Sequence, residues 1–123
     1  MKRSAIGHAL SLSCLLAACT LTATCSPTPG PTTTYSAVFL TNNQVYFGKL
    51  DGWGTAHPVL TDVYYVQTQV NQETKEIKNT LIKRGNEWHA PDRMFLNPNQ
   101  VLFAEPVTDQ STVSKLIEQL NKH

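Results

Sequence analysis

The chain has 123 residues, of which 41% are hydrophobic and 15% are charged. This composition is apolar enough for a folded core, which excludes a disordered chain, and the length excludes a multidomain protein. Ten Lys and Arg stand against nine Asp and Glu, so the formal net charge is only +1. A nearly neutral chain lacks the many phosphate-binding cations of a nucleic-acid-binding protein, so we expect no nucleic acid partner.

The N-terminus has the three parts of a secretory signal: a positive start, a short apolar run and small residues at a cleavage site. Lys2 and Arg3 supply the charge, and Leu16-Ala17-Ala18-Cys19 ends the apolar run. These four residues resemble the lipobox of bacterial lipoproteins, which implies cleavage before Cys19 and a diacylglyceryl lipid on its sulfur. We therefore expect residues 1–18 to be a lipoprotein signal peptide. The protein would then be lipid-anchored at the extracytoplasmic face of the cell membrane.

Two other interpretations of this leader stay open. Residues 6–23 form a stretch of 18 mostly apolar residues that is long enough for an uncleaved signal anchor. Cleavage after Cys25 would instead release a soluble secreted protein. All three interpretations place the folded part outside the cytoplasm. No Cys follows Cys25, so the domain has neither a disulfide nor a thiolate metal site.

A linker separates the leader from the domain. Residues 26–34 contain three Pro and one Gly, and the other residues are Ser and Thr. This composition cannot form a core, and its Pro residues favour an extended, semi-rigid chain. We expect residues 19–34 to be a lipid-anchored spacer.

Residues 35–107 have the pattern of short strands separated by turn residues. The expected strands cover residues 37–40, 44–50, 59–70, 77–83, 93–96 and 100–104. Asn42 and Asn43 suit a hairpin turn because Asn tolerates positive φ. In the third strand, two sets of residues interleave: Val59, Thr61, Val63 and Tyr65 with Leu60, Asp62, Tyr64 and Val66. The pattern predicts a mainly β domain, a small five- or six-stranded antiparallel barrel of the SH3 or Sm-like kind.

The last segment, residues 108–123, is expected to be an amphipathic helix. Its apolar residues fall at i, i+3, i+4 and i+7, and they are Val113, Leu116, Ile117 and Leu120. Asp109 or Ser111 can cap its N-terminus. We expect this C-terminal helix to pack on the barrel, and the alternative is that it presents its apolar face to a partner.

Two of the expected hairpins share a short sequence pattern. Residues 43–47 and 99–103 share the pattern N-Q-V-x-F, each directly after a turn. We expect the Val and the Phe of each copy to lie on one face of its strand. There is no third copy, so the shared pattern indicates two similar hairpins and no repeat architecture.

The sequence LTNNQVYFGKL at residues 40–50 resembles the opening motif of Sm-like small β-barrels, and residues 97–103 loosely resemble their closing motif. The Asp-x-x-Met-Asn pattern that contacts RNA in that family is missing, because Gly52, Trp53 and Gly54 follow Asp51. The helix is also C-terminal here. An Sm-like nucleic-acid binder therefore stays only as an alternative.

A broader resemblance covers most of the domain. The patterns V-F-L-T-N-x-Q-V-Y-F-G-K-L at residues 38–50, V-L-x-D-V-Y-Y at 59–65 and Q-V-L-F-x-E at 100–105 resemble a family of short membrane-anchored bacterial proteins without known function. This resemblance implies the fold and the anchoring. It implies no activity.

The densest cluster of reactive side chains lies in residues 84–93. Glu87, His89 and Asp92 could bind a metal ion, with His57 as a further ligand, but their spacing matches no compact ligand motif. His89 and Asp92 also lack a Ser or Cys in a nucleophile setting. We expect no metal, no cofactor and no enzymatic activity. A metal-binding or hydrolytic protein that uses Glu87, His89 and Asp92 stays as the alternative.

Aromatic residues that we expect to be partly exposed favour a binding protein. Trp53 and Trp88 stand in expected loops, and Tyr65 or its neighbour must point outward from the third strand, so we predict that Trp53, Trp88 and Tyr65 bind a partner. The alternative is that each Trp covers one end of the barrel. Open strand edges also allow addition of a peptide or of a second copy. We therefore expect a binding or assembly module of the cell envelope, with a protein or peptide partner or as a homo-oligomer.

Overall fold

The computed structural model describes residues 29–123, so the expected signal peptide and lipid site Cys19 lie outside the described residues. The described part contains six strands, one α-helix and one short 3-10 helix. The strands are β1 (Tyr35–Leu40), β2 (Val45–Asp51), β3 (Val59–Val70), β4 (Ile77–Lys83), β5 (Arg93–Phe95) and β6 (Val101–Val107). The helices are η1 (Pro98–Gln100) and α1 (Thr112–Asn121). The predicted mainly β fold with a C-terminal helix is confirmed.

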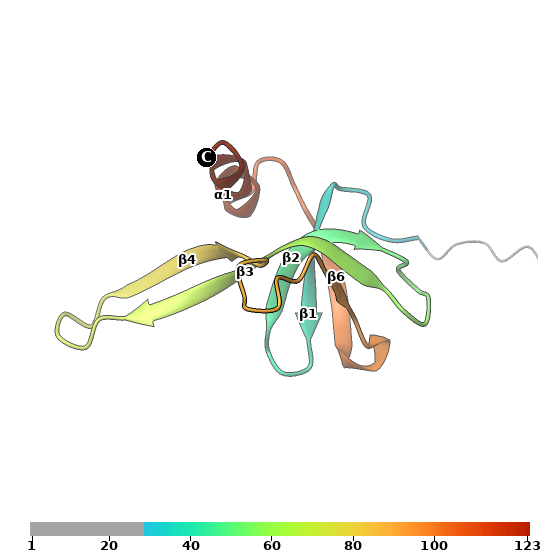
Figure 1. Ribbon diagram of the computed structural model, residues 1–123, viewed down its shortest axis with the longest axis horizontal. Coiled ribbons are helices and arrows are strands. Elements are labelled where there is room, and N and C mark those ends of the chain that lie inside the picture. Colours follow the sequence, from blue (N-terminus) through green and yellow to red (C-terminus); the bar gives the residue numbers. More distant parts are fainter. Residues whose placement is uncertain (1–28) are drawn as a thin grey trace, which may run out of the picture.

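All strands join one antiparallel sheet in the order β4-β3-β2-β1-β6. β5 pairs with residues 59–61 of β3, and β4 pairs with residues 64–70 of the same strand. Within the described residues β4 and β6 form the two ends of this order, so the sheet is not closed into the expected barrel. The reason is the length of β3, whose second half leaves the other strands and continues with β4 alone (Figure 1).

The first hairpin turn forms as the sequence predicts. The backbone amide of Leu40 donates to the backbone carbonyl of Gln44 over 2.9 Å. The backbone amide of Asn43 donates to the backbone carbonyl of Leu40 over 3.1 Å. Asn43 has a φ of +64°, a left-handed conformation that Asn adopts more readily than most residues. The turn therefore sets the register of β1 against β2.

A β-bulge in β3 interrupts the regular alternation of this strand. The register passes from Phe47 opposite Tyr64 to Lys49 opposite Thr61, so two residues of β3 lie across from Gly48. The extra residue, Asp62, has a φ of +49°. Such a bulge reverses the alternation, and it puts Leu60 and Val63 together in one core.

The sheet has a core on each face. On one face, Val38, Leu60, Val63 and Leu96 form the buried centre. On the other face, Ile117 of α1 packs on Tyr64 and Leu81. The helix is capped by the Ser111 hydroxyl, which accepts a hydrogen bond of 3.1 Å from the amide of Ser114. The helix thus covers part of a sheet face, as expected for a helix packed on the β domain.

No helix among residues 29–123 has the length and apolar character needed to cross a membrane.

A second irregularity lies between β1 and β6. Phe39 faces Phe103 and Leu40 faces Val101, so Leu102 is left over in the register. This shift puts Val101 in the core of the first face and Phe103 on the opposite face. The expectation that the Val and the Phe of this N-Q-V-x-F copy share a face is therefore wrong. The inserted residue is not visible in the sequence pattern, because it depends on pairing with a strand about 60 residues away.

The second half of β3 and the start of β4 form an arm, which we define as residues 66–79. The arm extends away from the other strands (Figure 1), and every residue in it is exposed. Its strands stay paired up to Val70 and Ile77. The backbone amide of Asn71 donates to the backbone carbonyl of Glu76 over 2.9 Å, and this bond closes the turn at the tip of the arm. The arm is therefore a regular two-stranded ribbon without a core of its own.

Candidate functional site

The loop of residues 84–93 uses its charged side chains in local ion pairs. The carboxylate of Glu87 accepts from the Gly85 amide over 2.7 Å and from the Arg84 guanidinium over 2.9 Å. These two donors hold the pKa of Glu87 below its usual value. Asp92 binds Arg93 over 2.7 Å, and this contact likewise lowers the pKa of Asp92. Both carboxylates are therefore charged and already have cationic neighbours.

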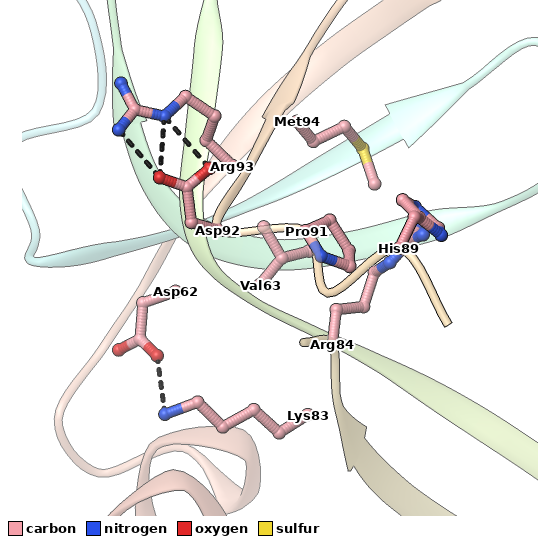
Figure 2. Close-up of a pocket in the computed structure, with 9 residues that line it drawn as sticks. All are labelled: Asp62, Val63, Lys83, Arg84, His89, Pro91, Asp92, Arg93 and Met94. Atoms are coloured by element: carbon pink, nitrogen blue, oxygen red, sulfur yellow. Dashed lines mark hydrogen bonds and ion pairs between the residues drawn. The ribbon is translucent and has the colours of Figure 1, made fainter. Parts of the chain in front are cut away.

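Next to this loop lies a cavity of about 470 Å³ (Figure 2). Its lining residues are Asp62, Val63, Lys83, Arg84, His89, Pro91, Asp92, Arg93 and Met94. Figure 2 shows two separate ion pairs, Asp62 with Lys83 and Asp92 with Arg93, with Val63 and Pro91 between them. The volume suits a small molecule, but the charges at the rim neutralise one another.

The three side chains of the metal-binding alternative, Glu87, His89 and Asp92, do not converge in this loop. His89 and Asp92 both line the cavity, whereas Glu87 faces Arg84 and Gly85. Within residues 29–123, no group of three or more His, Cys, Asp and Glu side chains is arranged to hold a metal ion. In this arrangement the loop forms ion pairs and offers no preformed set of metal ligands.

A polar cluster at the base of the arm centres on Asp62. Its carboxylate accepts from the Tyr35 hydroxyl and forms an ion pair of 3.0 Å with Lys83. The Tyr64 hydroxyl lies 3.3 Å from Asp62 and 3.1 Å from the Asn121 side chain at the end of α1. The cluster therefore connects the bulge of β3, the first strand and the helix.

The pKa values in this cluster reflect one shared carboxylate. Burial disfavours the charged form of Asp62, but hydrogen bonds from Tyr35 and Lys83 outweigh it and lower the pKa of Asp62. Burial and the neighbouring Asp62 raise the pKa of Tyr35. The hydrogen bond to Asp62 raises the pKa of Lys83. At neutral pH, Asp62 is thus an anion with a neutral phenol and an ammonium beside it, which stabilises the fold.

A groove of about 640 Å³ separates the first hairpin from the arm. Its lining residues are Phe39, Asn43, Gln44, Val45, Tyr46, Phe47, Tyr65, Val66, Gln67 and Thr68. Tyr65 packs edge to face on Tyr46, with ring centres 6.4 Å apart. The groove begins where the pairing of β2 with β3 ends, at Tyr46 and Tyr65. Tyr65, a predicted binding residue, is therefore part of a real concave surface.

A second apolar surface lies on β1 and β6 and adjoins the groove, because Phe39 belongs to both. Phe39 and Phe103 stack with ring centres 4.4 Å apart, and Phe103 is 46% exposed. The preceding residue of the outer strand β6, Leu102, is 59% exposed. We call Phe39, Leu102 and Phe103 the aromatic edge. Sequence reasoning missed it, because the stack depends on the pairing of β1 with β6, which no local pattern reveals.

The two Trp residues differ in their surroundings. Trp53 is half-buried, and the backbone of Gly30 lies so close that a Cβ there would be 3.2 Å from the Trp53 Cβ. Trp88 is fully exposed in the 84–93 loop. The structure thus leaves Trp88 open to a partner and partly covers Trp53, and it does not gather Trp53, Trp88 and Tyr65 into one site.

No protein-family model matches the chain, and no curated protein matches its sequence. The candidate sites therefore rest on the residues and contacts described above.

Proposed function

We propose that this chain is a lipid-anchored binding or assembly module on the extracytoplasmic side of the cell envelope, and that it is not an enzyme. The observation that carries the binding part is the aromatic edge. Leu102 and Phe103 lie on β6, the outermost strand, and are 59% and 46% exposed, and Phe39 lies on the neighbouring β1. Clustered aromatic side chains at a surface are the usual anchors of protein recognition.

The partner that fits this edge is an extended segment of another envelope protein. Within the described residues β6 pairs with β1 alone, so the outward backbone groups of residues 101–104 are open to a further strand, whereas Glu105 and Pro106 discourage pairing beyond them. Strand addition supplies main-chain hydrogen bonds, and alternate apolar side chains supply contacts to the stacked rings. Tyr65 in the groove, Trp88 in its loop and the less accessible Trp53 are additional contact residues in this proposal.

The anchoring part is supported by the lipobox resemblance at Cys19, which is tested by mass spectrometry of the N-terminus. We expect the natural chain from membranes to begin at an acylated Cys19. In Cys19→Ser this species is lost, whereas the control Cys25→Ser keeps it. An intact Met1 in the membrane fraction of the natural chain and of Cys19→Ser would indicate a signal anchor and refute lipidation.

The binding part is tested by photo-crosslinking in intact cells. A photo-reactive phenylalanine analogue replaces Phe103 in one variant and Phe95 in the control. Phe95 is the better exposed of the two, at 71%, but it lies on β5, away from the aromatic edge. We expect a discrete adduct with one envelope protein from position 103 and none from position 95. Equal adducts from both positions, or none from position 103, would refute the proposed surface.

A further inference from the structure

One side of the β3 strand in the arm has no neighbouring strand among residues 29–123. The pairing of β2 with β3 ends at Tyr65, and residues 66–70 of β3 pair only with β4. The carbonyl of Val63 accepts from the Arg84 amide over 2.8 Å, and the Asn71 amide donates to Glu76. Both residues face the β4 side, so alternation along the strand leaves the backbone groups of Val66, Thr68 and Val70 facing the open side.

This open side lacks the features that normally block strand addition. Natural edge strands carry charges, Pro or bulges that discourage pairing. Residues 63–72 contain no charged residue, no Pro and no Gly. The groove of about 640 Å³ leaves free space along Tyr65, Val66, Gln67 and Thr68. An approaching strand therefore meets neither a charge nor a bulky obstacle at this end.

The sequence of the open strand is a palindrome. Residues 66–70 are Val, Gln, Thr, Gln and Val. If this strand pairs with the same strand of a second copy, antiparallel and centred on Thr68, each residue lies opposite a residue of the same type. Val66 faces Val70 of the second copy on one sheet face, and Gln67 faces Gln69 of the second copy on the other. Val–Val, Thr–Thr and amide pairs are favourable cross-strand neighbours.

We propose that the partner of this strand is a second copy of the chain. The two arms join through their β3 edges into a four-stranded antiparallel sheet with the order β4-β3-β3-β4. A two-fold axis passes between the two Thr68 residues, which gives a closed, symmetric dimer. Val66, Thr68 and Val70 each face their counterpart as a hydrogen-bonded pair with two backbone bonds.

The length of the open strand fits this pairing. With Val70 of the second copy opposite Val66, its Asn71 comes opposite Tyr65, where β2 begins to occupy the edge. Asn71 already starts the turn of the arm, so the incoming strand ends where the free edge ends. The same two-fold brings the exposed Val70 and Ile77 of each arm to the base of the other arm, on the face that α1 covers.

This dimer does not depend on the proposed envelope partner. It uses the backbone edge of β3, whereas strand addition at the aromatic edge uses the backbone of β6; the two surfaces share only Phe39, which also lines the groove. The self-association can therefore be measured on the purified chain alone. Failure of one proposal leaves the other standing.

Thr68 and Asn79 provide a matched pair of variants. They face each other across the arm, and the Thr68 hydroxyl donates to the Asn79 side chain over 2.8 Å. The backbone amide of Thr68 faces the open side of β3, and that of Asn79 faces the open side of β4 in the described part. Thr68→Pro and Asn79→Pro thus each remove one outward amide and the same side-chain bond, and Pro is tolerated at such outward positions.

The test is sedimentation equilibrium of the full chain purified in detergent. We expect the natural chain and Asn79→Pro to be dimers. Thr68→Pro loses both central hydrogen bonds, so we expect its dimer dissociation constant to rise by about tenfold or more. A natural chain that stays monomeric up to about 100 µM would overturn the proposal. Equal dimer affinities of the two variants would overturn it as well.

Cross-linking in cells gives a second measurement that does not depend on the Pro variants folding. The two Thr68 residues would have Cα atoms about 5.5 Å apart, within the range of a disulfide. Under mild oxidation, Thr68→Cys should give a disulfide-linked dimer beyond any band from the natural cysteines. Asn79→Cys, separated from its counterpart by three strand spacings of about 4.8 Å, should not. Two outcomes would contradict the pairing: disulfide-linked dimers in equal amounts from both variants, or no additional dimer from either variant.

Discussion

The two halves of β3 have the same secondary structure but very different surroundings. In the first half, Leu60 lies in the core of one sheet face and Tyr64 in the core of the other, and both are completely buried. In the second half, Val66 and Val70 are 43% and 50% exposed, although both are residues that strands favour. The first half is held by two cores, whereas the second is held only by its hydrogen bonds and side-chain pairs with β4.

This difference indicates that the two halves of β3 have different roles: the first half stabilises the fold, and the second half offers a surface for association. An isolated two-stranded ribbon is only marginally stable in water, so the arm contributes little to the stability of the fold. It nevertheless keeps a regular register over its whole length and presents an uncharged, open strand. We therefore expect mutations in the body of the sheet to change unfolding, and mutations in the arm to change association.

The largest effect is expected from Leu60→Ala. Leu60 is completely buried, so its truncation loses apolar burial and leaves a cavity, at a cost of about 3 kcal/mol in the free energy of unfolding. Ile77→Ala in the arm removes a comparable side chain that is 68% exposed, and should cost less than about 1 kcal/mol. Urea denaturation at a concentration where the chain is monomeric measures both. Similar costs would show that the arm is as important for stability as the core.

A smaller loss is expected from Gly48→Ala. A Cβ at Gly48 would lie 2.7 Å from Leu60 and 2.8 Å from the Thr61 carbonyl, and the carbonyl cannot move without shifting the bulge. We expect a cost of about 2 kcal/mol by thermal denaturation. The control is Gly30→Ala, whose Cβ would meet the Trp53 side chain at 3.2 Å, so a smaller cost is expected. The reverse order would mean that the bulge adapts more easily than Trp53.

The sequence predicted the strands well but not their irregularities. The expected strand 59–70 coincides with β3, since its apolar and β-branched residues signal a strand locally. The bulge at Asp62 stayed hidden, because it arises from pairing with β2. The open sheet was also missed. Whether a long strand curls into a barrel or continues as an arm depends on contacts between distant segments.

For the candidate sites as well, the sequence predicted local features but not contacts between distant residues. Tyr65 was predicted as a binding residue from strand alternation, and it does line a groove. Phe39 and Phe103 were not identified, because 64 positions separate them and only the sheet order brings them together. Glu87 and Asp92 are close in sequence, yet each binds a neighbouring Arg, a choice that depends on loop geometry.

A moderate, pH-dependent effect is expected from Asp62→Asn. Because folding lowers the pKa of Asp62, its contribution is complete above about pH 5 and falls as the pH decreases through the unfolded value of about 3.9. Removing the charge should cost about 1–2 kcal/mol at pH 7 and progressively less towards pH 2. Asn also tolerates the positive φ of this position, so the bulge is kept.

The measurement for Asp62 is urea denaturation at a series of pH values. Asp109→Asn, an exposed carboxylate before the helix, serves as the control and should leave the profile nearly unchanged. A constant difference between the natural chain and Asp62→Asn over the whole pH range would contradict the role of the charged carboxylate at the base of the arm.

The smallest effect is expected from Val70→Thr, and it compares the two halves of β3 most directly. Thr has nearly the shape of Val, so the substitution changes polarity with little change in packing. At Val63, which is 5% exposed, the new hydroxyl would be buried in the core, and we expect a cost of about 1–3 kcal/mol. At the half-exposed Val70 the hydroxyl can reach water, so the monomer should lose less than about 0.5 kcal/mol. If urea denaturation of the monomer gave equal costs at both positions, residues 66–70 would be packed like a core strand, and their open edge could not be available to a second copy.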